Sequence, residues 1–178
     1  MSNKERIVEK YIQLASKKPL GIELENIDPV ELFNETQNAI SLKDKLNRFG
    51  QIFKGLEGLK QFVTPYYNSN KDKLYSFRDA IFYNEMVQIQ VFFEFIKDLK
   101  VDSSKSPLLY LIIENKNNQR LNKIRNSIAH FDWKLKGDKI EFKDNNYSRE
   151  ENYYDISEFC SLISLIAIFM TNDINQIE

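Results

Sequence analysis

The sequence predicts an all-α fold, a helical bundle of about five to six helices with a small β-hairpin after the helix that carries the candidate site. Apolar residues recur at helical spacing along most of the chain. The 178 residues include only five glycines and four prolines, which argues against a turn-rich all-β protein. The chain is long enough to bury a substantial core, and we expect one domain over residues 1–178.

The composition excludes several classes of protein. Hydrophobic residues make up 42% of the chain and aromatic residues 13%, so the chain is not intrinsically disordered. The formal net charge of −1 gives no overall positive field of the kind that marks many nucleic-acid-binding proteins. Cys160 is the only cysteine, which excludes a disulfide framework and a cysteine-based metal cluster. Its apolar neighbours predict a buried structural thiol.

The sequence also predicts a soluble, cytoplasmic protein without membrane contact. The first residues lack the apolar run of a signal peptide. The longest apolar run, residues 159–170, is interrupted by serines and is shorter than the about 20 residues that span a bilayer. A single cysteine fits a reducing compartment.

The first helix is predicted over residues 3–16, where a broad apolar stripe recurs at helical spacing. Pro19 and Gly21 should end the segment. The apolar residues of the stripe are Ile7, Val8, Tyr11, Ile12, Leu14 and Ala15.

The next helix is predicted to begin at Asp28. This residue serves as the N-cap, Pro29 takes the first helical position, and Glu31 closes a capping box. The apolar pattern continues to Phe49, and we expect a break near Gly50.

Two further helical segments follow in the middle of the chain. The first covers residues 52–63, is weakened by glycines and should stop at Pro65, within a loop over residues 64–71. The second, over residues 72–100, is the longest and has a wide apolar face. Charged residues interrupt that face, and solvation or an internal ion pair accounts for them: Arg78, Asp79 and Glu85.

The helix with the candidate site should begin after Ser106, a plausible N-cap before Pro107, and end near His130. Apolar residues then alternate with charged ones on both sides of Gly137 and Asp138, which predicts a β-hairpin.

The last part of the chain is predicted as a polar linker over residues 147–154 and a final helix. Asp155, with Glu158 three residues later, should cap a helix that reaches about residue 175. Because this helix is apolar nearly all round, it belongs in the bundle centre or at a subunit interface.

The segment from Leu121 to Trp133 carries the best candidate for a functional site. It contains the only histidine of the chain, His130, five residues after Arg125. On a helix, Asn126 and His130 lie one turn apart on one face, and Arg125 lies toward the edge of that face. The segment therefore groups a cation, an amide and an imidazole, while apolar residues on another face hold the helix in place.

The residue inventory excludes most catalytic templates. One histidine and one cysteine do not build a His/Cys metal site, and we expect no metal and no other cofactor, although a carboxylate-only metal site stays open. The chain has no glycine-rich phosphate loop, and no serine lies in a nucleophile elbow. Arginine presents a planar donor fork to phosphate, and histidine transfers protons near neutral pH. Together they suit attack by an RNA 2′-hydroxyl on the adjacent phosphate.

A structural explanation of the same residues is also open. A lone histidine near a helix C-terminus often stabilises the helix dipole, and helical arginines are usually solvated.

The stretch Arg125-Asn126-Ser127-Ile128-Ala129-His130 resembles the Arg-x4–6-His motif of the HEPN superfamily, including the polar residue directly after the arginine. The resemblance extends into Phe131-Asp132-Trp133, the hairpin and the last helix. It implies a four-to-five-helix bundle that dimerises and that often acts as a metal-independent endoribonuclease in toxin–antitoxin, phage-defence or RNA-processing systems. By this resemblance, Arg125 would bind the scissile phosphate, Asn126 would orient it, and His130 would transfer protons.

The resemblance implies RNA and a second copy of the chain as partners, with an antitoxin or defence-system protein in some members. One branch of the superfamily carries a tyrosine two residues after the histidine. This chain has Asp132 there, so regulation through such a tyrosine is not expected.

Two other functions stay open at this point. The domain could be a non-cleaving RNA- or nucleotide-binding module, since the motif residues hold a phosphate without breaking it. It could also be a structural or partner-binding bundle that uses an exposed, apolar last helix as its interface.

Overall fold

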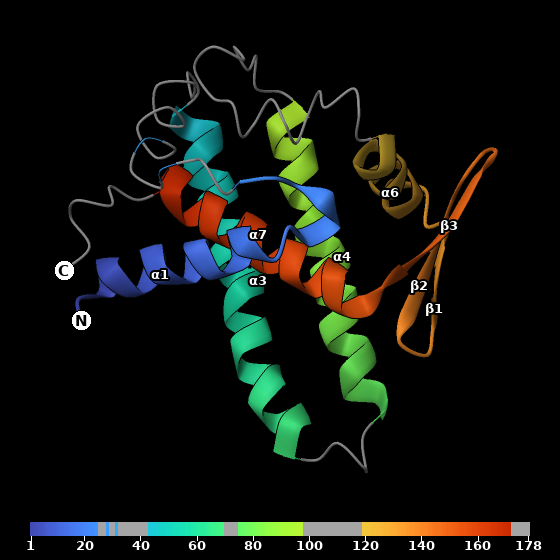
Figure 1. Ribbon diagram of the computed structural model, residues 1–178, viewed down its shortest axis with the longest axis horizontal. Helices are drawn as coiled ribbons and strands as arrows, with labels where there is room; N and C mark the ends of the chain where they lie inside the picture. The colour runs from blue at the N-terminus through green and yellow to red at the C-terminus, as the bar shows by residue number, and fades with distance from the viewer. Residues whose placement is uncertain (25–27, 29–30, 32–42, 70–74, 98–118, 172–178) are drawn as a thin grey trace.

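In the computed structural model the chain forms a helical bundle with a small antiparallel sheet at one side (Figure 1). The structure describes residues 1–24, 28, 31, 43–69, 75–97 and 119–171. The described α-helices are α1 (Asn3–Ser16), α3 (Lys43–Ser69), α4 (Tyr75–Lys97), α6 (Gln119–Ala129) and α7 (Tyr153–Thr171). The remaining elements are the 3-10 turn η1 (Pro19–Gly21) and the strands β1 (Trp133–Lys136), β2 (Lys139–Asp144) and β3 (Tyr147–Asn152). The predicted helical fold with a small β element is confirmed.

Helix α7 lies at the centre of the bundle. Its apolar residues include Ile156, Phe159 and Ile163, whose side chains are fully buried. The helix packs against α1, α3, α4 and η1, and in Figure 1 it crosses behind α1 and beside α3 and α4. Its apolar character on nearly all sides therefore serves the core, as predicted for a helix in the bundle centre. The alternative of an exposed last helix as a partner interface is wrong for the described part of α7.

Helices α3 and α4 pack side by side along the bundle (Figure 1). The predicted break near Gly50 is wrong, and so is the predicted loop as far as Ser69, because α3 continues through Gly50 and past Pro65. Proline removes one backbone donor, and the Thr64 hydroxyl donates to the Lys60 carbonyl at 2.7 Å in the turn before it. Packing along α4 outweighs the low helix propensity of these residues.

A polar seam is buried where α3, α4 and α7 meet. The Glu85 carboxylate is fully buried, lies 2.9 Å from the Lys60 ammonium and accepts a hydrogen bond of 2.7 Å from the Ser157 hydroxyl. The buried Cys160 thiol donates to the side-chain oxygen of Gln88. Burial raises the pKa of this thiol far above its ordinary value, which keeps it protonated and unreactive. The predicted internal ion pair is confirmed for Glu85, and so is the buried structural thiol. The side chains of Arg78 and Asp79 lie outside the described residues.

Lys60→Met should lower the free energy of unfolding by about 3–5 kcal/mol, because it leaves the buried Glu85 carboxylate without its cation. Adding Glu85→Leu removes that orphaned charge, so the double variant should regain most of the loss. Urea unfolding followed by circular dichroism measures both changes. Lys54→Met, at an exposed position of the same helix, is the matched control. Equal losses in the single and double variants would show that packing, and not charge, accounts for the effect.

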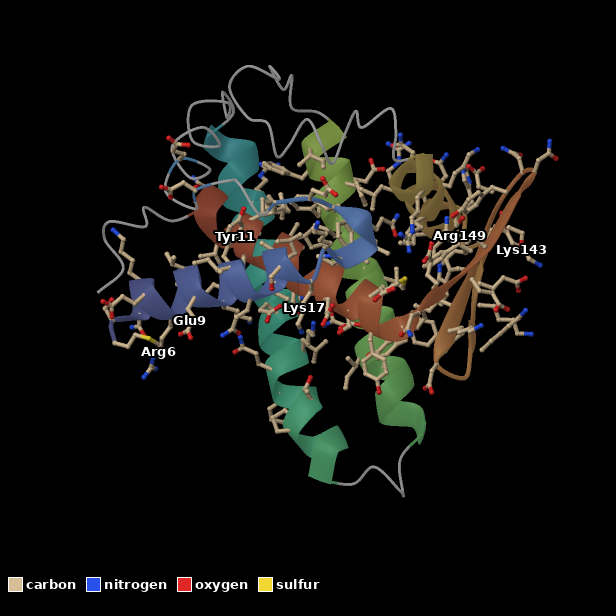
Figure 2. The ribbon with its side chains drawn as sticks, in the orientation of Figure 1. Arg6, Glu9, Tyr11, Lys17, Lys143 and Arg149 are labelled. Carbon is tan, nitrogen blue, oxygen red and sulfur yellow. The ribbon has the colours of Figure 1, made fainter. Side chains whose placement is uncertain are left out.

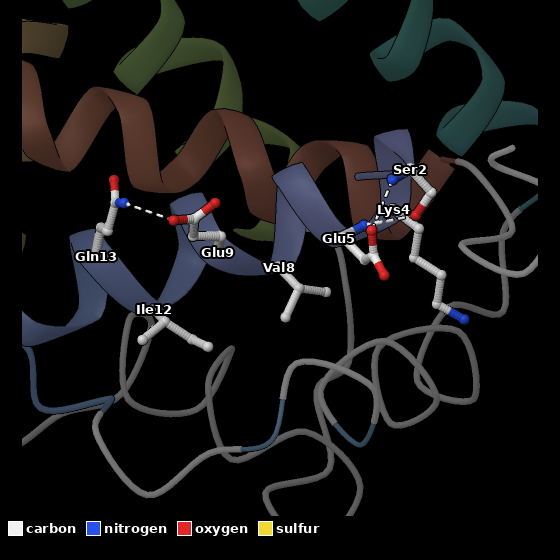
Figure 3. A pocket seen from close by; sticks show the side chains of 7 residues that line it. All are labelled: Ser2, Lys4, Glu5, Val8, Glu9, Ile12 and Gln13. Carbon is white, nitrogen blue, oxygen red and sulfur yellow. Dashed lines mark hydrogen bonds between the residues drawn. The ribbon is translucent and has the colours of Figure 1, made fainter.

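Helix α1 begins where the sequence predicts. The Ser2 hydroxyl accepts a hydrogen bond of 3.2 Å from the Glu5 backbone, and the Glu5 carboxylate accepts one of 2.7 Å from the Ser2 backbone. A shallow groove runs along the outer face of this helix past Val8 and Ile12 (Figure 3). It lies on the side of the molecule away from α6 (Figure 1).

The sheet has the order β1-β2-β3, and both pairs of strands are antiparallel. The predicted hairpin at Gly137 and Asp138 is confirmed. The predicted polar linker over residues 147–154 is wrong, because residues 147–152 form β3. A strand made mostly of polar residues is not detected by a pattern of hydrophobicity. Glu151 of β3 is buried through ion pairs with arginines and not through apolar character.

The final helix also begins earlier than predicted. Helix α7 starts at Tyr153, and the Asn152 side chain accepts a hydrogen bond of 2.8 Å from the Tyr154 backbone. Asn152 therefore caps the helix in place of Asp155, which falls in the first turn. The predicted end near residue 175 lies outside the described residues, as do most of the helix predicted from Asp28 and the start predicted after Ser106.

Among the described residues, no helix combines the length and apolar character that crossing a membrane requires.

Candidate functional site

Helix α6 presents one apolar face and one polar face, as its spacing predicts. Leu121, Ile124 and Ile128 are buried in the core of the bundle. The polar face carries Asn126 and, one turn later, His130, whose backbone N–H donates to the Asn126 carbonyl at 3.0 Å. The core contacts therefore fix the rotation of the helix about its axis and leave the polar face turned outward.

The end of α6 is joined firmly to the sheet. The buried Ser127 hydroxyl lies 2.6 Å from the Lys143 carbonyl and 2.8 Å from the Lys123 carbonyl. The Asp132 N–H donates to the Ser127 carbonyl, and the Lys143 N–H donates to the Asp132 carbonyl, each at 2.8 Å. These bonds fix where β2 passes the polar face of the helix.

The Arg125 side chain is turned toward Asn126. Its Nε and Nη2 atoms donate to the Asn126 Oδ1 atom at 3.2 and 2.8 Å. The position of Arg125 on the helix lies about 100° away from that of Asn126, so these bonds draw the guanidinium toward the face of His130. An arginine has about five N–H groups, and those not used by Asn126 have no partner among the described residues.

Asp144 at the end of β2 anchors Asn126 in turn. The Asn126 amide donates to the Asp144 carboxylate at 3.0 Å, and the Lys123 ammonium lies 3.0 Å from the same oxygen. These two hydrogen bonds, that of Asn126 first, lower the pKa of the Asp144 carboxyl, and the charge of His130 acts in the same direction. The carboxylate therefore stays ionised at neutral pH and holds the Asn126 amide in one orientation.

Sequence reasoning missed Asp144 and Lys123. Asp144 lies well beyond the end of the motif in the sequence. Only the packing of β2 against α6 brings its carboxylate to Asn126. A local signal was available in Asn145 and Asn146, which form a two-residue turn between β2 and β3. Asn145 has a φ of 52°, a backbone conformation that asparagine tolerates better than most residues. That turn would have placed Asp144 at the end of a strand.

His130 follows α6 directly and is exposed to solvent. Among the described residues, its imidazole makes no hydrogen bond. Of the predicted residues, the structure thus joins Arg125 and Asn126 by hydrogen bonds and places His130 one turn beyond Asn126. Asp144, which was not predicted, holds Asn126.

Two positive side chains on the sheet are paired with carboxylates. Figure 2 shows Lys143 and Arg149 on the strands beside α6. Arg149 lies 3.1 Å from the Glu151 carboxylate, and Lys143 lies 3.6 Å from the Glu141 carboxylate. The Lys143 side chain is largely exposed, and because successive side chains of a strand alternate, it lies on the face of the sheet opposite Asp144.

Chemically, the site offers an arginine fork, a fixed amide and an accessible imidazole. No group of three or more histidine, cysteine or acidic residues that could bind a metal occurs in the described part of the chain. The hollow of about 650 Å³ between α3 and α7 is lined by other residues, including Glu57, Gln61 and Ser164. Arg125 and His130 are therefore candidates for a surface site, and a guanidinium fork suits an anionic ligand such as a phosphate.

Comparison with known proteins adds one finding. A family model described as HEPN pEK499 p136 matches residues 1–176, so the match includes α6, His130 and all three strands. No curated protein and no solved structure gave a match to the chain.

Proposed function

Because the chain belongs to the HEPN family described as HEPN pEK499 p136, we propose that it is a metal-independent endoribonuclease of the HEPN type. One observation carries the proposal most directly. The Arg125 guanidinium is held by Asn126, which Asp144 holds in turn, on the helix that ends at the accessible His130. A cation positioned in advance stabilises charge that develops on a phosphate without reorganising during the reaction.

The proposed reaction begins at an RNA 2′-hydroxyl. A neutral His130 removes the hydroxyl proton, and the 2′-oxygen forms a bond to the adjacent phosphorus. The bond from phosphorus to the 5′-oxygen breaks, and a protonated imidazole gives its proton to that oxygen. Arg125 binds the phosphate oxygens and stabilises their charge through its remaining N–H groups. The products are a 2′,3′-cyclic phosphate end and a 5′-hydroxyl end.

The reaction works best with one group that removes the proton of the nucleophile and another that protonates the leaving oxygen, and one chain supplies a single histidine. HEPN domains often dimerise, and a two-fold dimer in which the motifs converge would bring two copies of His130 to one cleft. We therefore include a homodimer with a shared site in the proposal. A role in a toxin–antitoxin or phage-defence system, with a protein partner from that system, is the setting we propose for such an activity.

Purified protein should cleave single-stranded RNA in the presence of EDTA and leave 2′,3′-cyclic phosphate ends. The reason is that the proposed attack needs no metal to activate a nucleophile. Gel electrophoresis of a labelled oligonucleotide, with mass spectrometry of the ends, measures the activity and the chemistry together. Products with a 3′-hydroxyl, or activity that appears only with added divalent metal, would contradict the proposal.

The same assay separates an enzyme from a module that only binds RNA. Binding that persists in His130→Ala and falls in Arg125→Ala, without cleavage by the wild type, would assign the site to phosphate binding alone.

A further inference from the structure

Phe131 is an aromatic side chain that the bundle does not bury. It follows His130 directly, and 77% of its surface is exposed. Both of its chain neighbours, His130 and Asp132, are exposed as well. Single exposed apolar residues are common on protein surfaces, so exposure by itself assigns no role.

Phe131 has a backbone conformation that phenylalanine rarely adopts. Its φ is 58°, in the left-handed region. The Phe131 N–H donates to the Ile128 carbonyl at 3.2 Å, and the Asp132 N–H donates to the Ser127 carbonyl at 2.8 Å. This pair of bonds ends α6 as a Schellman motif, in which the left-handed position is usually glycine. A bulky side chain there strains the backbone.

Leu20 shows one way in which such strain is compensated. It has a φ of 54°, and only 2% of its surface is exposed, so burial of its side chain offsets the cost of its backbone. Phe131 has a similar backbone and gains little from burial. Neither the turn nor the core therefore accounts for a phenylalanine at this position.

The position of the ring suits contact with a ligand. The backbone after Phe131 is fixed by the bond from the Lys143 N–H to the Asp132 carbonyl, so the ring projects from a rigid joint. Because the backbone is already fixed, only the side-chain torsions of Phe131 lose entropy on binding. Phe131 is adjacent in the chain to His130, and Arg125 lies on α6, the helix that ends just before them.

We propose that Phe131 is a stacking platform for an unpaired RNA base next to the phosphate that Arg125 binds, an inference that rests on the proposed function. Bases stack on aromatic side chains with little dependence on sequence, because every base has a π-face. The exposed carboxylate of Asp132 disfavours a phosphate at this point and leaves the ring to an uncharged base. The substrate is then single-stranded RNA or a loop, since a paired base is not free to stack on the ring.

The test compares four substitutions of Phe131. Phe131→Gly removes the ring and relieves the strain, whereas Phe131→Leu keeps an apolar side chain of similar bulk without a π-face. Both should lower kcat/KM on a single-stranded RNA by roughly 5- to 150-fold, the range that loss of one stacked base gives. Phe131→Tyr and Phe131→Trp should cleave within about threefold of the wild type. Phe131→Gly should at the same time raise the Tm by roughly 2–4 °C.

Stacking is measured separately from cleavage. The probe is a single-stranded RNA oligonucleotide that contains one 2-aminopurine, whose fluorescence is quenched on stacking, bound to the His130→Ala protein. Adding Phe131→Leu to that protein should abolish the quenching and weaken binding, and binding of a duplex of the same sequence should not change. Phe62→Ala, which removes an exposed aromatic ring from α3, is the matched control.

Each outcome decides the inference. Normal cleavage and quenching in Phe131→Leu would overturn it while leaving the proposed ribonuclease in place. Quenching that depends on Phe131, in a protein that cleaves no RNA, would support stacking and refute the enzyme. If the substitutions changed the sedimentation of the protein and not its binding to RNA, the ring would be a contact between copies and the inference would fall.

Discussion

His130→Ala is expected to lower the rate of RNA cleavage by about 10²- to 10⁴-fold, the contribution that positioned acid–base groups usually make. The imidazole is exposed and lies outside the core, so the free energy of unfolding should change by less than about 0.5 kcal/mol. A labelled single-stranded RNA measures cleavage, and thermal unfolding measures stability. Because the chain has no second histidine, any residual bell-shaped pH profile in the variant would have to arise from other groups.

The same variant tests whether two subunits share one site. Wild type is mixed with rising excess of His130→Ala under conditions in which subunits exchange. If both imidazoles are needed, activity per total protein should fall as the square of the wild-type fraction, so an equal mixture retains about one quarter. One copy then acts as base and the other as acid, and the coupled pair should give a bell-shaped pH–rate profile for the wild type.

A linear fall in that experiment, to about one half in an equal mixture, would show that each subunit works alone. Full activity in a protein that sedimentation shows to be a monomer would lead to the same conclusion. An unfolded His130→Ala protein would instead show that the residue stabilises the end of α6, in line with the structural explanation of a helix-terminal histidine.

Arg125→Lys is expected to lower cleavage by about 10²- to 10³-fold while leaving the Tm nearly unchanged. Lysine keeps the positive charge but lacks the planar fork that binds a phosphate with two parallel bonds and donates to Asn126 at the same time. The loss should appear in kcat more than in KM, since the fork is proposed to act on the charge of the transition state.

The matched control is Arg6→Lys, which makes the same change at an exposed position on α1, on the far side of the molecule from α6 (Figure 2). It should retain wild-type cleavage. If Arg125→Lys unfolded the protein, Arg125 would be a structural residue that stabilises the joint of α6 with the sheet. Unchanged cleavage in a folded Arg125→Lys protein would show that charge alone is sufficient and that the fork has no role.

Local sequence was sufficient for those parts of the molecule that depend on neighbours one helical turn apart. The apolar spacing over residues 3–16 predicted a helix with the bounds of α1, Asn3–Ser16. The spacing of Leu121, Ile124 and Ile128 identified the buried face of α6 because helical geometry alone places them together. Asn126 and His130 share the other face for the same reason.

Only the tertiary structure decided the features that depend on residues distant in the chain. Helix α3 continues through Gly50 and past Pro65 because it packs on α4, whereas propensity considers each residue alone. Strand β3 went unrecognised because Arg120 and Arg149 neutralise Glu151, so a charged residue is buried where a pattern of hydrophobicity predicts a linker.

For the candidate site, too, the sequence identified some features and the tertiary structure decided others. The residues Arg125, Asn126 and His130 were identified from their types and their spacing on one helix. Their arrangement depends on Asp144, which the antiparallel pairing of β2 and the contact of β2 with α6 bring to the Asn126 amide. The sequence determined which groups are available for chemistry, and the packing of a strand against a helix decided how they are held, because hydrogen-bond geometry is set by positions in space and not by spacing along the chain.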